Sequence, residues 1–500
     1  MTIELDGPGT TVADVVAVAR TGDPVRLTAA AIERMAASRA IVDGLAGGAA
    51  KYGISTGFGA LATVAIPPER RRDLQFALVR SHAAGMGDPV EDEVVRAMVF
   101  LRARTLAMGH SGTRPRLAEA MVDILNAGIT PVVPEYGSLG ASGDLAPLAH
   151  AAMTLIGEGT ASRDGETVTA AEALADAGLE PIDLAEKEGL ALTNGTDGIL
   201  GQLCLAVHDI TDLLDQADMV AAMTVEGLLA TDAPFAADLQ DLRPHPGQRA
   251  SAANLRRMLA DSPIIASHAG PTDTRVQDAY SIRCTPAVHG AARDTLDHGR
   301  AVAERELASA IDNPMVLPDG RVESCGNFHG APLGFAADFL AIALAEVGAI
   351  AERRIDRMMD QGRNHGLAPF LAEEVGVDSG IMIGHYTAAG LASENKRLAA
   401  PASVDSLPTS AMQEDHVSMA WHATRKLRRV VDNTRRILAV EWVCAARAIE
   451  LRAPLVPAPA TGALVELLRT RVPGAGPDRF LSPELAAAEA LLRDAALPHP

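Results

Sequence analysis

Apolar residues recur at helical spacing along most of this chain, and the longest such stretches lie after residue 195. Four of them alternate apolar and charged faces over many helical turns: 198–230, 286–310, 331–361 and 412–451. Helices of this length bury their apolar faces by packing side by side. The pattern therefore predicts an all-α protein built on a long central helical bundle.

The first 200 residues follow a different pattern, in which short helical stretches alternate with glycine-rich turns. Such turns, at 53–59, 85–87 and 137–143, are typical of segments that shape a site. We therefore expect three regions that together form one catalytic unit. These are an N-terminal region carrying the site loop, the central bundle and short C-terminal helices, at 1–200, 201–455 and 456–500.

Composition fits this helical interpretation and excludes some partners. Hydrophobic residues make up 48% of the 500 residues but aromatic ones only 3%, so alanine and leucine supply the apolar surface. The most apolar long segment, 335–351, is interrupted by Asp338 and Glu346, which predicts a core helix rather than a membrane span. The net charge of −20 argues against a nucleic-acid or anionic-membrane surface.

The four cysteines favour a reducing compartment. Cys204, Cys284, Cys325 and Cys444 form no close pair and have no metal-ligand spacing. The first residues lack the charged start and apolar core of a secretion signal. We therefore expect a cytoplasmic protein without a metal.

A cluster of small residues at 137–150 is the strongest indication of chemistry, because a sharp turn rich in glycine costs backbone entropy. In a tight enough turn, the Gly143 nitrogen can attack the Ala141 carbonyl carbon, and loss of water closes an imidazolone ring. Loss of the Ser142 hydroxyl as a second water leaves an exocyclic methylene, an electrophile that no ordinary side chain provides. The alternative is that Ser142 or Asp144 only caps the following helix.

The block 137–150 resembles the signature of the aromatic amino acid lyase family, whose members build a methylidene-imidazolone (MIO) group from Ala-Ser-Gly. Further blocks occur in the family's order at 52–59, 194–196, 276–284, 312–314, 326–330 and 413–419. The resemblance covers about 40–455 and is strongest for the family's histidine-specific branch. It implies an aspartase/fumarase-like architecture, an MIO group formed autocatalytically from Ala141, Ser142 and Gly143, and no external cofactor.

The resemblance implies non-oxidative elimination of ammonia from L-histidine to give trans-urocanate, the first step of histidine degradation. This reaction needs a base for a weakly acidic β-proton and an electrophile for the amine. The family pattern makes Tyr52 the base and places Tyr280, Asn194 and Gln277 around the MIO ring. It assigns Arg283 to the substrate carboxylate, which a guanidinium binds bidentately. Taken singly, each of these residues could instead belong to an ordinary buried polar network or to the surface.

Recognition of the substrate ring is assigned to His82, Met382 and Glu414, with Phe328 as an aromatic wall. His82 and Glu414 could satisfy the donor and the acceptor of an imidazole, whereas an apolar ring would leave them unpaired. For Glu414 a structural alternative exists, because 410–413 matches a capping box that would place it in the first turn of a helix.

The resemblance further implies a homotetramer in which each site draws residues from three chains. Three other functions stay open: a tyrosine or phenylalanine ammonia-lyase, an MIO 2,3-aminomutase that returns ammonia to the product, and a non-catalytic helical scaffold with an unmodified Ser142. The chain departs from the commonest family pattern beside the site blocks, which bears on substrate preference, at Thr285, His289, His385 and Met412.

Overall fold

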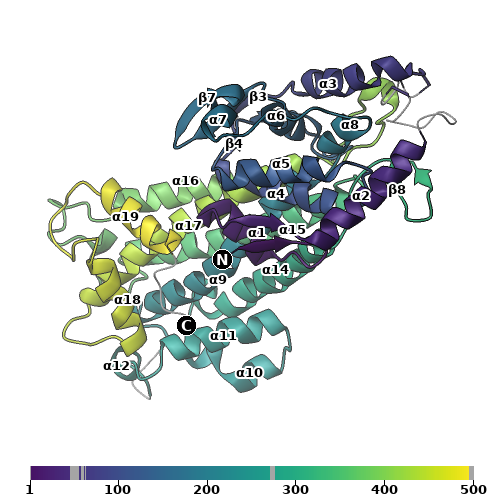
Figure 1. Ribbon diagram of the computed structural model, residues 1–500. Coiled ribbons are helices and arrows are strands. Elements are labelled where there is room, and N and C mark those ends of the chain that lie inside the picture. The colour runs from purple at the N-terminus through teal and green to yellow at the C-terminus, as the bar shows by residue number, and fades with distance from the viewer. Residues whose placement is uncertain (1, 46–55, 58–60, 62, 271–275, 495–500) are drawn as a thin grey trace. The chain divides into compact units, whose positions relative to one another are not determined.

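The computed structural model describes residues 2–45, 56–57, 61, 63–270 and 276–494, and it is predominantly helical, which confirms the all-α prediction (Figure 1). The chain forms two compact units, each assembled from three stretches. Unit 1 comprises Met1–His208, Gly299–Asp338 and Pro401–Arg425, and unit 2 comprises Asp209–His298, Phe339–Ala400 and Lys426–Pro500. The three consecutive regions expected from the sequence stay a prediction.

In unit 1, several helices surround a nearly fully buried one, α4 (Asp92–Ala107). Its helices are α1 (Val12–Val16), α2 (Ala29–Gly44), α3 (Arg71–His82), α4 (Asp92–Ala107), α5 (Pro115–Asn126), α6 (Leu145–Leu155), α7 (Ala170–Asp176) and α8 (Glu188–Thr193). Residues 97–107 of α4 are all buried, whereas α5 buries one face and starts at Pro115, which suits a first helical turn. Helices α3, α6 and α8 pack against one another and form the scaffold of the site.

The strands in the described part of unit 1 are short and form four small sheets. Strands β1 (Ile3–Leu5) and β2 (Val25–Leu27) are parallel, with Glu4 opposite Arg26. The other sheets are antiparallel and consist of β3 (Met86–Pro89) with β5 (Pro134–Tyr136), of β4 (Thr130–Pro131) with β6 (Thr160–Arg163) and β7 (Glu166–Thr169), and of β8 (Met315–Val316) with β9 (Val322–Glu323). Strand β5 leads directly into the turn that carries Ser142.

The four long helices predicted from the apolar pattern are present, and four of the five boundaries between the units fall within them. They are α9 (Asp197–Gly227), α14 (Thr285–Leu307), α15 (Ala331–Met359) and α17 (Ala420–Glu450). The start predicted at residue 412 for the last helix is wrong. Met412 and Met419 have φ angles of 71° and 51°, which a right-handed helix excludes, so helix α17 begins after them.

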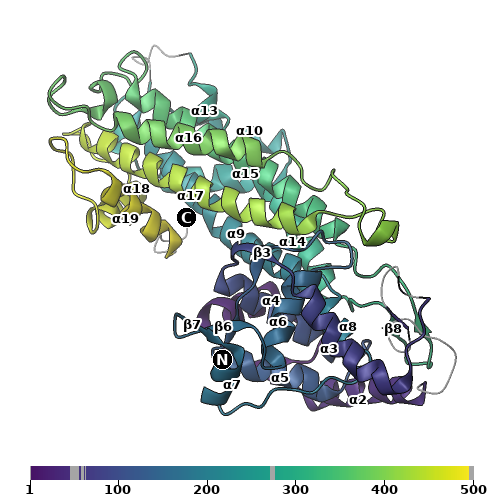
Figure 2. The ribbon, with the colours of Figure 1, turned by 90° about the horizontal axis from the view of Figure 1, so that it is seen from above.

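Unit 2 also contains α10 (Ala237–Asp241), α11 (Pro246–Met258), α12 (Pro263–Ala266), α13 (Tyr280–Arg283), α16 (Met382–Leu398), α18 (Pro459–Arg469) and α19 (Ser482–Arg493). Within this unit, helices α15, α16 and α17 run side by side (Figures 1 and 2). Buried polar side chains join its helices. The Glu441 carboxylate accepts from Arg354 Nη2 at 2.9 Å and from Thr224 Oγ1 at 2.8 Å. This buried carboxylate on α17 thus bonds to one side chain on α15 and one on α9. Because a buried ion pair needs good geometry, these bonds fix the positions of the three helices relative to one another.

One helix in the described part of the chain, α15, is long and apolar enough by composition to cross a membrane. Of its most apolar window, 61% is buried within the protein, as in a core helix. Asp338, the eighth residue of this helix, accepts a hydrogen bond from the Ser403 amide at 2.8 Å. A paired, buried carboxylate of this kind is typical of a protein interior.

Candidate active site

The turn between β5 and α6 contains two glycines that have no room for a side chain. Gly140 and Gly143 have φ angles of 65° and 71°. A Cβ atom on Gly143 would overlap the carbonyl group of Gly195, and one on Gly140 would overlap the Ser418 hydroxyl. The turn is therefore pressed against two neighbouring segments of unit 1, with Ala141 and Gly143 buried and Ser142 partly exposed.

Asp144 anchors this turn and does not cap the next helix. Its carboxylate accepts from Ser138 Oγ at 2.8 Å and from the Ile199 amide at 2.9 Å, and its own amide donates to the Gly195 carbonyl at 2.7 Å. Helix α6 has no side-chain capping bond from Asp144, and the Ser142 hydroxyl points to Glu414 Oε1, 3.4 Å away. The interpretation of Ser142 and Asp144 as helix caps is therefore wrong.

The environment of Asp144 makes stability depend on pH. Burial raises the pKa of this carboxyl from its ordinary 3.8 to about 7, against the opposing bonds from Ile199 and Ser138. Because the folded protein binds the proton more tightly than the unfolded chain, the stabilisation is complete below pH 3.8 and is lost as the pH rises through 7. In urea titrations, we expect the free energy of unfolding of Asp144→Asn to fall less steeply over this range than that of the wild type. Equal slopes would contradict the buried proton.

A cavity of about 700 Å³ opens beside the turn, and all of its lining belongs to unit 1. Helices α3 and α8 contribute apolar side chains to it, among them Leu74, Leu78 and Leu190. Its polar lining consists of Ser81, His82, Ser142, Asn194, Asn313, Ser410 and Glu414. A concave, mostly apolar space with a few convergent polar groups is typical of a small-molecule site. The structure thus brings together four of the predicted site residues, His82, Ser142, Asn194 and Glu414.

His82 ends helix α3 and faces the cavity as a neutral ring. Burial lowers the pKa of His82, and the nearby Glu414 carboxylate raises it only in part. The Nδ1 atom lies 3.2 Å from the Ser81 hydroxyl. A neutral imidazole carries one donor and one acceptor, so His82 can form a directional hydrogen bond to a polar ring in the cavity.

Glu414 is held on a backbone bridge rather than in a helix. Its Oε2 atom accepts from the Thr409 hydroxyl at 3.0 Å, and the Thr409 amide donates to the Glu414 carbonyl at 3.0 Å. The segment Ser410–Met412 is a single 3₁₀ turn without a side-chain cap, and Ser410 and Ala411 have φ angles of 50° and 51°. The capping-box alternative for Glu414 is therefore wrong, and its carboxylate faces Ser142.

Asn194 lines the cavity, and its side-chain oxygen is buried. Its Nδ2 atom donates to the Asn313 carbonyl at 2.9 Å, whereas its buried Oδ1 atom has no hydrogen-bond partner among the described residues. Buried polar atoms are nearly always paired, so the unpaired Oδ1 atom is available to a donor that approaches this side chain. Asn313, which the sequence interpretation did not single out, holds the amide in this orientation.

Three predicted residues cluster in unit 2, just before α14. The Arg283 guanidinium lies 4.4 Å from the centre of the Tyr280 ring, and its Nε donates to the Asp278 carbonyl at 2.9 Å. The Tyr280 side chain is 70% exposed, and Gln277 is exposed as well. The Asp278 carboxylate accepts from the Thr231 amide at 2.9 Å and so fixes this segment.

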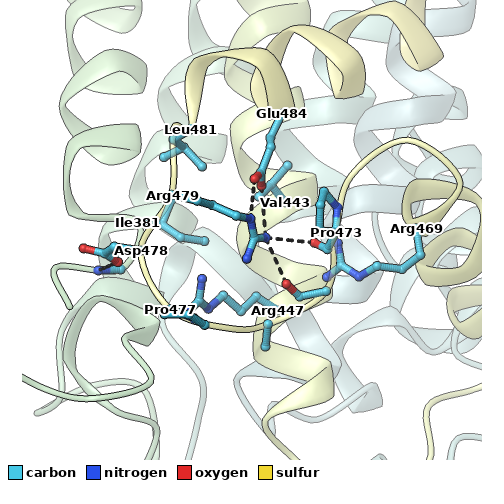
Figure 3. A pocket seen from close by; sticks show the side chains of 13 residues that line it. Ile381, Val443, Arg447, Arg469, Pro473, Pro477, Asp478, Arg479, Leu481 and Glu484 are labelled. Atoms are coloured by element: carbon cyan, nitrogen blue, oxygen red, sulfur yellow. Dashed lines mark hydrogen bonds and ion pairs between the residues drawn. The ribbon is translucent and has the colours of Figure 1, made fainter. Parts of the chain in front are cut away.

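Met382 is the first residue of helix α16, also in unit 2. The turn before it is tied to the C-terminal region, because the Asp478 carboxylate accepts from the amides of Ser379 at 2.6 Å and Gly380 at 2.8 Å. Figure 3 shows the small pocket at this turn, which Ile381 and Asp478 line. Its volume of about 20 Å³ has room for a single water molecule, so it is not a substrate site.

Tyr52 and Phe328 are the remaining predicted residues. Tyr52 lies outside the described residues. Phe328 is half-buried in unit 1 between β9 and α15, and the neighbouring His329 ring stacks on His416 at 5.8 Å. His416 follows Glu414 by two positions, so this stack joins the Phe328 loop to the Glu414 segment. The roles of all twelve predicted site residues stay predictions.

Comparison with known proteins identifies the relatives of this chain. Residues 10–470 match the aromatic amino acid lyase family. A histidine ammonia-lyase of Streptomyces avermitilis is 59% identical over 499 residues, covering 99% of this chain and 97% of that protein.

Solved structures agree with these relatives. The tyrosine aminomutase from Streptomyces globisporus has a TM-score of 0.95 at 38% identity, with 99% of this chain and 98% of that one covered. The histidine ammonia-lyase from Trypanosoma cruzi has a TM-score of 0.92 at 38% identity, with 99% and 94% covered. With its glycine-restricted Ala-Ser-Gly turn at the edge of a ligand-sized cavity, the chain belongs to the aromatic amino acid lyase family.

Proposed function

We propose that this protein eliminates ammonia from L-histidine to give trans-urocanate and that it uses an MIO group formed from Ala141, Ser142 and Gly143. The observation that carries the proposal is the position of Ser142. Its hydroxyl faces Glu414 in a cavity that His82 also lines. Relatives named histidine ammonia-lyases that match almost the whole chain support the same substrate.

The residues around the turn fit an MIO group. Gly143 is the residue whose nitrogen must join the ring, and its φ of 71° and contact with Gly195 allow no side chain. The unpaired Asn194 Oδ1 is a ready acceptor for a donor at this place. When present, the MIO group supplies an electrophile for the amino group of the substrate.

The side chains of the chain itself supply recognition and proton transfer. His82 and Glu414 offer hydrogen bonds to both nitrogens of an imidazole, and Leu74, Leu78 and Leu190 exclude water around it. In the same proposal, Arg283 binds the carboxylate and Tyr52 accepts the β-proton. Gln277, Tyr280, Phe328 and Met382 complete the site.

Intact mass combined with a product assay tests the proposal. We expect the purified protein to be lighter than its sequence by two waters and to generate the ultraviolet absorbance of a conjugated product from L-histidine. An unmodified mass would favour the helical scaffold. Separation of the products distinguishes an aminomutase, the activity in the name of the Streptomyces globisporus relative, because it would yield a β-amino acid and little free ammonia.

We further propose a homotetramer in which each site draws residues from three chains, and the surface of α15 supports it. Phe339 and Ile342 are three residues apart on the part of this helix that belongs to unit 2, and they are 49% and 43% exposed. In unit 2, Phe339 and Ile342 border a groove of about 840 Å³ shared with α14. Apolar side chains in contiguous patches mark association surfaces.

We expect Phe339→Glu to dissociate the assembly and to lower activity in parallel, because a buried charge at the contact has no partner. Sedimentation velocity and activity are measured on the same samples across a dilution series. Phe480→Glu is the matched control, since Phe480 is an exposed phenylalanine elsewhere in unit 2, at 77%. A fully active monomer would contradict the shared site.

We also propose a cytoplasmic location. All four cysteines lie within the described residues, and all four are free thiols in the structure. Free thiols persist in a reducing compartment, which supports the proposal. Fractionation of the native cells with detection of the protein tests it.

A further inference from the structure

Gly195 lies between the Ser142 turn and a buried arginine in the core of unit 1. On one side, Gly143 and Gly195 form a parallel backbone bridge, and the Asp144 amide donates to the Gly195 carbonyl at 2.7 Å. On the other side, a Cβ atom on Gly195 would overlap the guanidinium of Arg102 and the carboxylate of Asp197. The turn, Gly195 and the guanidinium therefore form three layers in direct contact.

The Arg102 side chain is fully buried and connects three segments. Its Nη1 atom donates to the Asn194 carbonyl at 2.8 Å and lies 3.0 Å from Asp197 Oδ2, and its Nη2 atom donates to the Ile311 carbonyl at 3.0 Å. Hydrogen bonds from a charged donor are stronger than neutral ones, and the planar fork fixes their directions. Arg102 thus holds the peptide between Asn194 and Gly195 in place from behind.

We propose that Arg102 is a positioning residue for ring closure in the Ala141–Gly143 turn; the inference rests on the proposed function. Closure requires the Gly143 nitrogen to come closer to the Ala141 carbonyl carbon than ordinary contact allows. The Gly195 backbone packs against the turn and prevents it from relaxing outward, and Arg102 holds Gly195 in this position. Holding reacting atoms together in this way accelerates an intramolecular reaction.

Ring closure in this turn needs no oxidant and no added reactant. The Gly143 nitrogen bonds to the Ala141 carbonyl carbon, and the carbonyl oxygen leaves as water with the amide protons of Gly143 and Ser142. The Ser142 hydroxyl then leaves as a second water with the Ser142 α-proton, which creates the exocyclic double bond. Arg102 touches none of these atoms and acts only through Asn194 and Gly195.

The chain offers a matched control two positions further along α4. Arg104 is also fully buried, but its guanidinium donates to the carbonyls of Glu306 and Ser309 instead of Asn194. Replacing either arginine by lysine keeps the charge and most of the stem. A lysine has a single nitrogen, so Arg102→Lys cannot reach the Asn194 and Ile311 carbonyls as the two Nη atoms do.

The test follows water loss over time by intact mass after full-length protein is made in a cell-free system and translation is stopped. Folding is monitored separately by thermal unfolding and tryptophan fluorescence. We expect Arg102→Lys to lose its two waters at least about tenfold more slowly than the wild type, as the loss of a buried charged hydrogen bond implies. Arg104→Lys should lose water at the wild-type rate, even if its unfolding temperature falls equally.

Equal rates in the folded Arg102→Lys and Arg104→Lys proteins would overturn the inference. If Arg102→Lys does not fold, Asp197→Asn replaces it, because this variant removes the negative partner of Arg102 while keeping its shape. Wild-type dehydration in a folded Asp197→Asn would then overturn the inference. A wild-type protein that never loses two waters would instead refute the proposed MIO group itself, so the two failures are distinguishable.

Discussion

Ser142→Ala is expected to lower kcat for L-histidine by at least about a thousandfold while the protein keeps its fold. The variant lacks the hydroxyl that must leave as water, so no exocyclic methylene can form. Among the described residues that hydroxyl bonds to Glu414 Oε1 at 3.4 Å, and the loss of such a long, partly exposed contact costs about 1 kcal/mol or less. Circular dichroism and thermal unfolding verify the fold, and intact mass verifies that no water is lost.

Ser410→Ala is the matched control for this prediction. Ser410 lines the same cavity but lies outside the Ala-Ser-Gly turn, so its variant should keep the dehydrated mass and activity within about threefold of the wild type. Near-normal turnover by Ser142→Ala would refute both the MIO group and the elimination mechanism proposed from it.

His82→Phe is expected to lower kcat/KM for L-histidine by at least about tenfold and to change the order of substrates. Without His82 the substrate imidazole loses a hydrogen-bond partner, which costs about 1–3 kcal/mol. An apolar side chain at this position also rejects phenylalanine less strongly, so the preference for histidine over phenylalanine narrows. The measurement is kcat/KM for histidine, phenylalanine and tyrosine.

Arg283→Lys separates ring recognition from general binding. If Arg283 binds the carboxylate common to all three substrates, this variant should weaken them together and leave their order unchanged. Equal losses for the three substrates in His82→Phe would show that His82 does not recognise the ring. The assignment of L-histidine would then depend on Glu414 or Met382.

The helical architecture could be predicted because it depends on local pattern. The predicted ends of α9, α14 and α15 lie within three residues of the observed ones, since apolar spacing and charged faces are properties of contiguous sequence. The start of α17 could not be predicted in this way. Met412 and Met419 carry no glycine-like signal, yet their positive φ angles hold the segment in an irregular loop that brings Glu414 to Ser142.

Ring closure in the Ala141-Ser142-Gly143 turn could be proposed from the sequence because it involves neighbouring residues. Only the tertiary structure identified what holds them. Asp144 could be interpreted as a helix cap until its bonds to Ser138 and Ile199 were known. Arg102 stands in an apolar run without any motif, and its single sequence signal is a charge inside a buried helix.

The sequence alone thus determined most of the helices and the position of the Ala-Ser-Gly turn, and it allowed the residues around a substrate to be proposed. Which side chains meet at the turn was decided by tertiary structure. Asn194, Asn313 and Glu414 are more than 50 residues from Ser142 along the chain, and their contacts arise from the packing of separate segments in unit 1. Local periodicity encodes which face of a helix is buried, whereas the partner of a buried polar group depends on the three-dimensional path of the whole chain.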